Sequence, residues 1–345
     1  MTGYGKTGTT IKDVANEVGL SITAVSQVLN GKDCRISQEK RILIQQKAKE
    51  LNYQPNRNAV ALVTNCTKII GVILNDISNI YFAEFAKGAE DIASENGYQL
   101  LLVNMQNRWN KPKSFANLLG YDTTDGLIIT RDLDTPELKK YIDTYYYERK
   151  KPVANAGNGE FIFPSGNIIF DNEQGGYIAT KHLLELGHRR IGCITGSEHT
   201  PLSRLRGYKK ALLEYGIEYD ETLVKVGDYH EELATKHAKD LYEQGVTAIF
   251  AFNDLMAFGV YRMAEQNNLC IGKDLSVVGF DDLEFSAFLS TPLTTIQQPA
   301  YKMGEASCKM LIDMIKNDTQ TAEDVHFQPK LIVRKSTGYA ACEKK

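Results

Sequence analysis

Hydrophobic residues recur with a helical period over the first fifty positions, and residues that cap helices stand before each repeat. Thr10 and Asp13 have the spacing of a capping box, while Ser21 and Ser37 are placed to cap two later helices. Gly19 interrupts the pattern between the first two repeats. The pattern therefore predicts three short helices, at residues 11–17, 22–29 and 38–51.

From Lys68 onward the period changes, because short apolar runs rich in β-branched residues alternate with amphipathic helical stretches. Alternation of strand and helix is typical of parallel sheets with helices on both faces. The predicted strands are residues 69–74, 99–103, 126–130, 152–155, 168–171, 191–195, 248–252 and 276–280. The predicted helices include residues 81–95, 173–186, 205–215, 231–243 and 255–266.

Eight predicted strands fit two doubly wound lobes better than a single lobe. A closed barrel of βα units also suits this length and is the alternative architecture. The irregular segment between Trp109 and Phe115, and a second start of the pattern at Phe170, count against the barrel. The predicted fold class is a small all-α headpiece followed by an α/β body of two doubly wound parallel-sheet lobes.

The headpiece and the body differ in net charge. With 345 residues, 43% of them hydrophobic and 24% charged, the chain can bury a large core, which excludes disorder and collagen-like repeats. Residues 1–66, up to a proposed linker that ends near Cys66, contain nine basic and five acidic residues and have a net charge of +4. The remainder of the chain has a net charge of −7. A cationic head on an anionic body suggests that the head meets a polyanion, with ordinary charge fluctuation as the alternative.

Several chemistries have no support in the sequence. The six cysteines form no CxxC pair and no zinc spacing with histidines, so neither a metal site nor a disulfide framework is predicted. There is no Walker loop, HExxH or GxSxG motif, and the side chains of the adjacent Asp281 and Asp282 are expected to point apart. We therefore predict no cofactor and no enzyme. The chain has no signal-peptide core and no run of 18 apolar residues, so we expect a soluble cytoplasmic protein.

Residues 10–30 have the parts of a helix-turn-helix, although a plain three-helix core fits the spacing equally well. The stretch TIKDVANEVGLSITAVSQVLN and the ending LNYQPN resemble the lactose repressor family of helix-turn-helix transcriptional regulators. The later blocks FDNEQGGYIATKHLLELGH, NDLMAFGV, VVGFDD and PLTTIQQP resemble the sensor of the same family, so the similarity covers nearly the whole chain. The resemblance implies a DNA-binding headpiece and a sensor similar to periplasmic sugar-binding proteins.

By this resemblance, the second helix of the headpiece faces the major groove of DNA. Ile22, Thr23 and Gln27 would then lie against base edges. Glutamine prefers adenine, whereas the arginine common at the Gln27 position in the family prefers guanine, so we expect a different base preference there. Thr10, Ser21 and Ser26 are expected to hold phosphates, and Asn30 and Asn56 complete the predicted set for the headpiece.

The segment from Asn56 to Thr64 resembles the hinge helix of the family. So short a helix is marginal alone, since isolated helices need about 12 to 15 residues, and it is expected to order on DNA beside its partner from a second subunit. Leu62 matches the leucine that such proteins insert into the minor groove at the centre of a palindrome. Without the flanking motifs, an ordinary linker leucine would be the simpler interpretation.

The resemblance places a small-molecule effector between the two lobes, at loops that follow strands. Arg204 occupies the position of a ligand-binding arginine, and with Asp281 it can bind hydroxyls through charge-assisted hydrogen bonds. The predicted effector-binding residues are Asn79, Tyr81, Phe82, Arg204, Asn253, Asp281 and either Gln297 or Gln298. The sensor is closest to ribose-type regulators, yet it reads Ala156-Gly157-Asn158-Gly159 where these often carry an Asp-Arg pair, so a pentose is not assigned.

These observations predict a homodimeric transcriptional regulator, most simply a repressor, that binds a palindromic double-stranded DNA operator under control of a small carbohydrate. A sugar-binding protein or a sugar-converting enzyme without a DNA role is the alternative. The predicted domains are a helix-turn-helix domain at 1–55, a hinge at 56–66, and an effector-binding and dimerisation domain at 67–345. Within the last, the first lobe is expected at 67–160 plus 297–320 and the second at 161–296 plus 321–340.

Overall fold

The computed structural model describes residues 9–31, 34–55, 57–105, 120, 122–130, 136–157, 163–196 and 200–340. Two compact units divide the chain, Met1–Thr67 and Lys68–Lys345. Each unit has hydrophobic residues of its own in its interior, and each is described separately below.

The first unit contains three packed helices, α1 (Ile11–Val18), α2 (Ile22–Leu29) and α3 (Gln38–Glu50), followed by α4 (Arg57–Thr64). Their apolar stripes meet in a small core of Val14, Ala15, Val25, Val28, Ile44 and Ala48. The capping box of Thr10 and Asp13 is present, and Ser21 caps α2 by accepting a hydrogen bond from the Ala24 amide. Ser37 stands at the N-cap of α3 without a side-chain capping bond, so that detail of the prediction was wrong.

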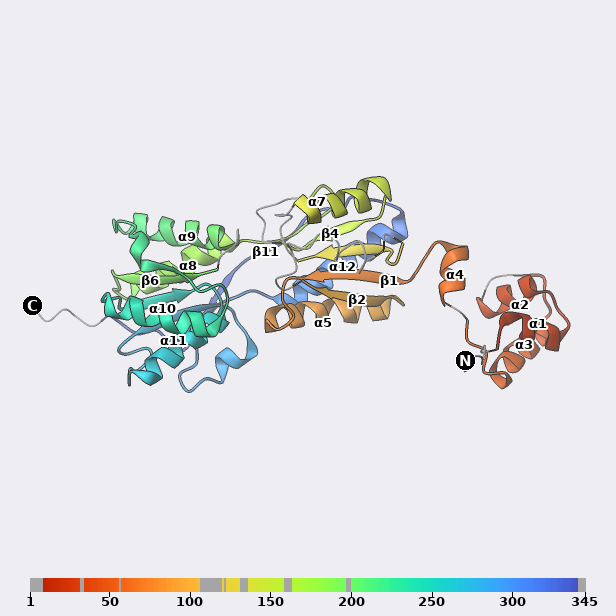
Figure 1. Ribbon diagram of the computed structural model, residues 1–345, viewed down its shortest axis with the longest axis horizontal. Helices are drawn as coiled ribbons and strands as arrows, with labels where there is room; N and C mark the ends of the chain where they lie inside the picture. Colours follow the sequence, from red (N-terminus) through yellow and green to blue (C-terminus); the bar gives the residue numbers. More distant parts are fainter. Residues whose placement is uncertain are drawn as a thin grey trace, which may run out of the picture. The chain divides into compact units, whose positions relative to one another are not determined.

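The first lobe of the second unit is built on a four-stranded parallel sheet in the order β2-β1-β3-β4. Its strands are β1 (Ile69–Leu74), β2 (Gln99–Asn104), β3 (Gly126–Ile129) and β4 (Val153–Asn155). Alternate residues of β1 enter different cores, because side chains along a strand point to opposite faces. Ile70, Val72 and Leu74 lie in the core shared with α5 (Ile80–Glu95) and α12 (Ala300–Asn317), while Ile73 lies in the core with α7 (Pro136–Asp143). Figure 1 shows α7 and α5 on opposite faces of this sheet.

The run Thr144–Glu148 continues α7 as a π-helix. Tyr145 and Tyr146 are buried, whereas Tyr147 is 58% exposed. The Tyr145 hydroxyl lies 2.9 Å from the Thr124 hydroxyl. Tyr145 and Tyr146 therefore serve packing, and neither joins the polar cluster described below.

The second lobe is built on a six-stranded sheet in the order β12-β10-β9-β8-β6-β7, parallel except for β12. Its strands are β6 (Ile191–Thr195), β7 (Val224–Val226), β8 (Ala248–Ala251), β9 (Ser276–Asp281), β10 (Thr294–Gln297) and β12 (Lys330–Ile332). Its helices are α8 (Asn172–Glu185), α9 (Thr200–Glu214), α10 (Glu231–Glu243) and α11 (Asp254–Gln266). Short 3-10 turns lie at Glu221–Leu223 and Glu284–Ala287.

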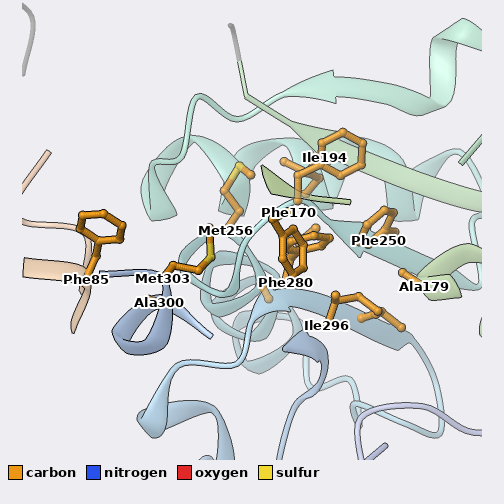
Figure 2. Packing of buried hydrophobic residues seen from close by; sticks show 14 of the residues in the cluster. Phe85, Phe170, Ala179, Ile194, Phe250, Met256, Phe280, Ile296, Ala300 and Met303 are labelled. Carbon is orange, nitrogen blue, oxygen red and sulfur yellow. The ribbon is translucent and has the colours of Figure 1, made fainter. Parts of the chain in front are cut away.

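Between the two sheets, β5 (Ile168–Phe170) pairs in parallel with β11 (Val325–Phe327). Phe170 of β5 and Phe280 of β9 lie side by side, with their ring centroids 5.9 Å apart in a T-shaped arrangement (Figure 2). A continuous hydrophobic core runs from α5 and α12 to the second sheet. Two open sheets of separate strand order confirm the two-lobed fold class and rule out the closed barrel.

The close contact between α5 and α12 in the first lobe depends on glycines. A Cβ on Gly88 of α5 would overlap the backbone carbonyl of Tyr301, and one on Gly304 of α12 would overlap that of Phe85. Among the residues described, no helix has both the length and the apolar character needed to cross a bilayer.

Candidate functional site

Five of the predicted effector-binding residues come together where strands of the second sheet end. Asp281 is the last residue of β9, while Asn253 and Gln298 lie just beyond β8 and β10. Parallel strands present their carboxyl ends at one edge, so these side chains share a location for topological reasons. Arg204 reaches this edge from α9 and Tyr81 from the first turn of α5.

Arg204 is the centre of the cluster and is 5% exposed. Its Nε donates to Asn172 Oδ1 at 2.9 Å, one terminal nitrogen donates to the Phe252 carbonyl, and the other donates to Gln298 Oε1 at 3.1 Å. The guanidinium also stacks on Phe280, 3.5 Å from the ring centroid. A guanidinium has five N–H donors. The described residues accept three of them, which leaves two N–H groups that can bind a ligand.

The charges of Arg204 and Asp281 act on each other. Burial lowers the pKa of Arg204 and the Asp281 carboxylate opposes that shift. Burial raises the pKa of Asp281 well above its usual range, and Arg204 opposes that shift in turn. Arginine stays protonated in proteins, so the cluster retains a buried cation beside a carboxyl group.

The Asp281 carboxyl accepts no side-chain hydrogen bond from the residues that the structure describes, and its backbone has a φ of 112°. A positive φ is strained for a residue other than glycine. Asp282 points elsewhere, because it pairs with Arg334 at 2.6 Å and accepts from Gln297 Nε2 at 2.8 Å. The two aspartates thus separate as predicted, and Gln298 rather than Gln297 belongs to the cluster.

Asn253 is 1% exposed and has two functions available at its two amide atoms. Its Oδ1 caps α11 by accepting from the Met256 amide at 2.9 Å. Its Nδ2 is buried and has no hydrogen-bond partner in the described part of the chain. A buried donor left unsatisfied costs about 1 to 3 kcal/mol, which favours a ligand that accepts a hydrogen bond at this point.

Contacts within the protein already engage Tyr81 and the two predicted residues outside the group of five, Asn79 and Phe82. Asn79 caps α5, where its Oδ1 accepts from the Tyr81 amide at 3.1 Å. Phe82 packs edge-on against the Tyr81 ring, with centroids 5.1 Å apart. The Tyr81 hydroxyl accepts from Gln298 Nε2 at 2.9 Å. These side chains shape the edge of the cluster, whereas its open polar atoms belong to Arg204, Asn253 and Asp281.

Sequence reasoning missed two neighbours of Arg204, namely Asn172 and Phe280. Both had a detectable signal, since Asn172 follows β5 and Phe280 stands one position before Asp281 on a predicted strand. Of the segment compared with ribose-type sensors, Ala156 and Gly157 are buried, and Asn158 and Gly159 lie outside the described residues. The described part of the chain contains no group of histidine, cysteine or acidic side chains suited to a metal ion.

In the first unit, the predicted base-reading residues lie at the surface of α2. Ile22 is 47% exposed, Thr23 is exposed and Gln27 is half-buried. An apolar side chain this exposed at the start of a small helix is available for contact with a partner. Asn30 instead donates to the Ser26 carbonyl at 2.8 Å and to its hydroxyl at 3.2 Å.

The other predicted DNA contacts lie at the N-caps of α1 and α2, on α4 and, in the sequence, directly before α4. Thr10 donates its hydroxyl to Asp13, and Ser21 is exposed beside its capping bond. Asn56 and the side chain of Leu62 lie outside the described residues, although the backbone around Leu62 is helical in α4. On that helix Val63 is 87% exposed.

Comparison with families of known proteins gives two matches. Residues 10–56 match the profile of bacterial regulatory proteins of the lacI family. Residues 180–337 match a periplasmic binding protein-like domain. The chain is 33% identical to the HTH-type transcriptional repressor PurR of Vibrio campbellii over 94% of its length and 97% of that protein. It is 32% identical to the HTH-type transcriptional regulator DegA of Bacillus subtilis over 95% of its length and 98% of that protein.

Solved structures show the same similarity. A Lac repressor dimer bound to operator and the anti-inducer ONPF has a TM-score of 0.83 at 27% identity, over 96% of this chain and 99% of that one. The regulator CelR in complex with cellobiose has a TM-score of 0.69 at 28% identity, over 95% and 99%. A LacI family regulator of Enterococcus faecium with bound ribose has a TM-score of 0.71 at 27% identity, over 79% and 100%. The full-length relatives are transcriptional regulators, not enzymes.

Proposed function

The chain belongs to the lacI family of bacterial regulatory proteins, and from this premise we propose that it is a homodimeric repressor whose hold on a palindromic operator is set by a small carbohydrate. Two headpieces per dimer would each place α2 in a major groove, with α4 and Leu62 at the centre of the site. Such a protein acts in the cytoplasm, where the chromosome is. Binding of the effector either releases the operator or tightens the binding of the protein to it.

The observation that carries the proposal is the set of open polar atoms around Arg204. Two guanidinium N–H groups and the buried Asn253 Nδ2 can donate, and the Asp281 carboxylate can accept. A hydroxyl both donates and accepts, so adjacent hydroxyls of a sugar can satisfy all of these groups together. Charge-assisted bonds of this kind are about twice as strong as neutral ones.

The ligands of similar proteins indicate which class of effector to test first. Structures similar to this chain hold cellobiose in one case and ribose in another. Both are neutral molecules rich in hydroxyls, which is the chemistry that the Arg204 cluster supports. We therefore propose a neutral sugar as the first class of effector to test.

The domain limits remain part of the proposal. A DNA-binding domain at 1–55, a hinge at 56–66 and a sensor at 67–345 would let a change in the lobes reach the hinge helices. Ordering or disordering a short segment is a known route from an effector site to a distant surface. A coupling of about 1 to 3 kcal/mol would change operator affinity by roughly 5- to 150-fold.

The test measures DNA and sugar binding on the same full-length protein. Fragments from upstream of its gene and its neighbours are titrated by fluorescence anisotropy, with and without D-ribose, cellobiose, nucleosides and sugar phosphates. We expect one fragment to bind and one class of compound to change its affinity. Gln27→Ala should weaken DNA binding and leave the thermal shift caused by the sugar unchanged. Turnover of a sugar without retention of any DNA would overturn the proposal in favour of an enzyme.

A further inference from the structure

Gln298 lies in the short connection between the lobes, directly after β10 of the second lobe and separated from α12 of the first lobe by Pro299 alone. The backbone N–H of Gln298 donates to the Asp281 carbonyl at 3.3 Å, and the backbone carbonyl of Gln298 accepts from the Ala300 N–H at 2.8 Å. Gln298 is thus held by its backbone to both an effector-site residue and the first turn of α12. A change at this residue reaches both lobes.

The side chain of Gln298 connects the same two lobes. Its Oε1 accepts from Arg204 at 3.1 Å, and its Nε2 donates to the Tyr81 hydroxyl at 2.9 Å. Tyr81 in turn lies 3.7 Å, hydroxyl to Sδ, from Met303 of α12. Gln298 is 6% exposed, so water does not compete freely for these bonds. The result is a buried chain of hydrogen bonds from Arg204 to α5.

Because both ends of its amide are engaged, Gln298 is poorly suited to be an effector ligand. A guanidinium is planar and rigid, so an effector that holds the two open N–H groups of Arg204 also fixes the N–H that Gln298 accepts. The orientation of the Gln298 amide then follows that of Arg204, and the Tyr81 bond follows the amide. An energetic coupling between two sites is reciprocal, so the position of α5 also affects Arg204.

We propose that Gln298 and Tyr81 are positioning residues that carry effector occupancy from Arg204 across the crossover to α5, through the hydrogen bonds Arg204–Gln298–Tyr81. This inference rests on the proposed function, since it assumes that the effector binds at Arg204. It assigns Tyr81 and Gln298 a role other than the ligand contact expected from the sequence. It also explains why a glutamine is useful there, because one amide supplies the acceptor and the donor that the relay needs.

The test measures amide hydrogen exchange of the full-length protein without ligand. Tyr81→Phe keeps the ring and removes both the bond from Gln298 Nε2 and the weaker bond of the hydroxyl to Met303 Sδ. Residues 298–303 and 79–85 should then exchange about 2- to 10-fold faster, the range expected mainly from the net loss of the Gln298 bond. Tyr261→Phe is the matched control, because its hydroxyl bonds the Thr291 carbonyl within the second lobe at 2.7 Å. It should leave both segments unchanged.

A double-mutant cycle then tests whether the two residues act as one unit. Gln298→Met keeps the length of the side chain and removes both bonds. If the relay exists, adding Tyr81→Phe to Gln298→Met should accelerate exchange less than Tyr81→Phe does in the wild type, because only the weak bond from the hydroxyl to Met303 Sδ remains to be lost. Additive acceleration, or unchanged exchange in Tyr81→Phe alone, overturns the relay.

A last arm uses D-ribose and cellobiose as probes. If either binds, it should slow exchange in residues 79–85 of the wild type and have less effect there in Tyr81→Phe, although it still binds. Equal slowing in both proteins overturns the relay. Failure of every sugar in the screen to bind counts against the proposed function instead, and the ligand-free results stand apart from that outcome.

Discussion

The Asp254 carboxylate accepts a hydrogen bond from the Leu283 amide at 2.8 Å, which joins the first turn of α11 to the loop after β9. It also accepts from the hydroxyls of Ser286 and Thr295, each at 2.6 Å. Asp281 stands two residues before Leu283, at the start of this loop. Asp254 therefore helps to hold Asp281 of the Arg204 cluster in place, through the loop that follows Asp281.

The pH dependence of stability follows from the burial of Asp254. Burial raises its pKa from 3.8 to about 6 even though three donors bond the carboxylate. The folded state then binds a proton more tightly than the unfolded state, so this group lowers the free energy of unfolding as the pH rises from about 4 to 6. At 1.36 kcal/mol per unit of pKa, the loss is about 3 kcal/mol.

Urea unfolding followed by circular dichroism at pH 4 to 7 measures this loss, with Asp254→Asn as the comparison. The pKa of Asp281 is also raised, by burial and in part by the charge of Asp254, so Asp254→Asn reduces the contribution of Asp281 to the loss in the same direction. We expect the free energy of unfolding of Asp254→Asn to fall less over this range, by about 3 kcal/mol. Parallel pH profiles for the two proteins would show that the carboxyl of Asp254 does not titrate there.

Asn253→Ser separates the two functions of Asn253. Serine is about as good an N-cap as asparagine, so α11 should keep its cap and the midpoint of thermal unfolding should change little. The amide donor is lost, and a hydrogen bond to a polar ligand contributes about 0.5 to 1.5 kcal/mol. Isothermal titration with the sugar identified by the screen should show affinity reduced by roughly 2- to 10-fold. Unchanged affinity would place the sugar away from Asn253 Nδ2.

The order of helices and strands was accessible from the sequence where the elements are long or strongly patterned. The strands β7, β11 and β12 were missed because each has three residues and is partly exposed, so none of them forms a buried apolar run. The equally short β4 and β5 are largely buried and were predicted. The sequence did not predict β10 as a strand either, although it pairs with β9 and β12. Such strands are formed by their neighbours in the sheet more than by their own sequence.

The site was predictable in position but not in detail. Residues after successive strands converge by topology, and this rule together with the family resemblance selected Arg204, Asn253 and Asp281. The sequence could not show which polar atoms are already bonded within the protein. Asn79 and Gln298 carry the same amide as Asn253, yet of these three residues only Asn253 has a buried nitrogen that no described residue bonds. That distinction depends on distances between segments far apart in the chain.

Gly88→Ala should disturb the contact between α5 and α12. The added methyl group would overlap the Tyr301 carbonyl, which belongs to a helix backbone and cannot rotate away. Overpacking of this kind costs about 1 to 3 kcal/mol, occasionally more. Thermal unfolding should show the loss, while Lys87→Ala at the exposed neighbouring position should stay within about 0.5 kcal/mol of the wild type. Equal stability of Gly88→Ala and the wild type would mean that the helices can move apart freely.

The identity of one operator base should depend on Gln27, which lies on α2 one turn after the exposed Ile22 and Thr23. A glutamine amide can bond the N6 and N7 atoms of adenine together, and such a pair contributes about 1 to 3 kcal/mol of discrimination. Selection of binding sites from random DNA should recover adenine at the position facing Gln27, and Gln27→Arg should shift that position to guanine. Gln27→Ala should relax it while the other positions keep their preference. Recovery of guanine by the wild type, unchanged in Gln27→Ala, would show that Gln27 does not contact the base.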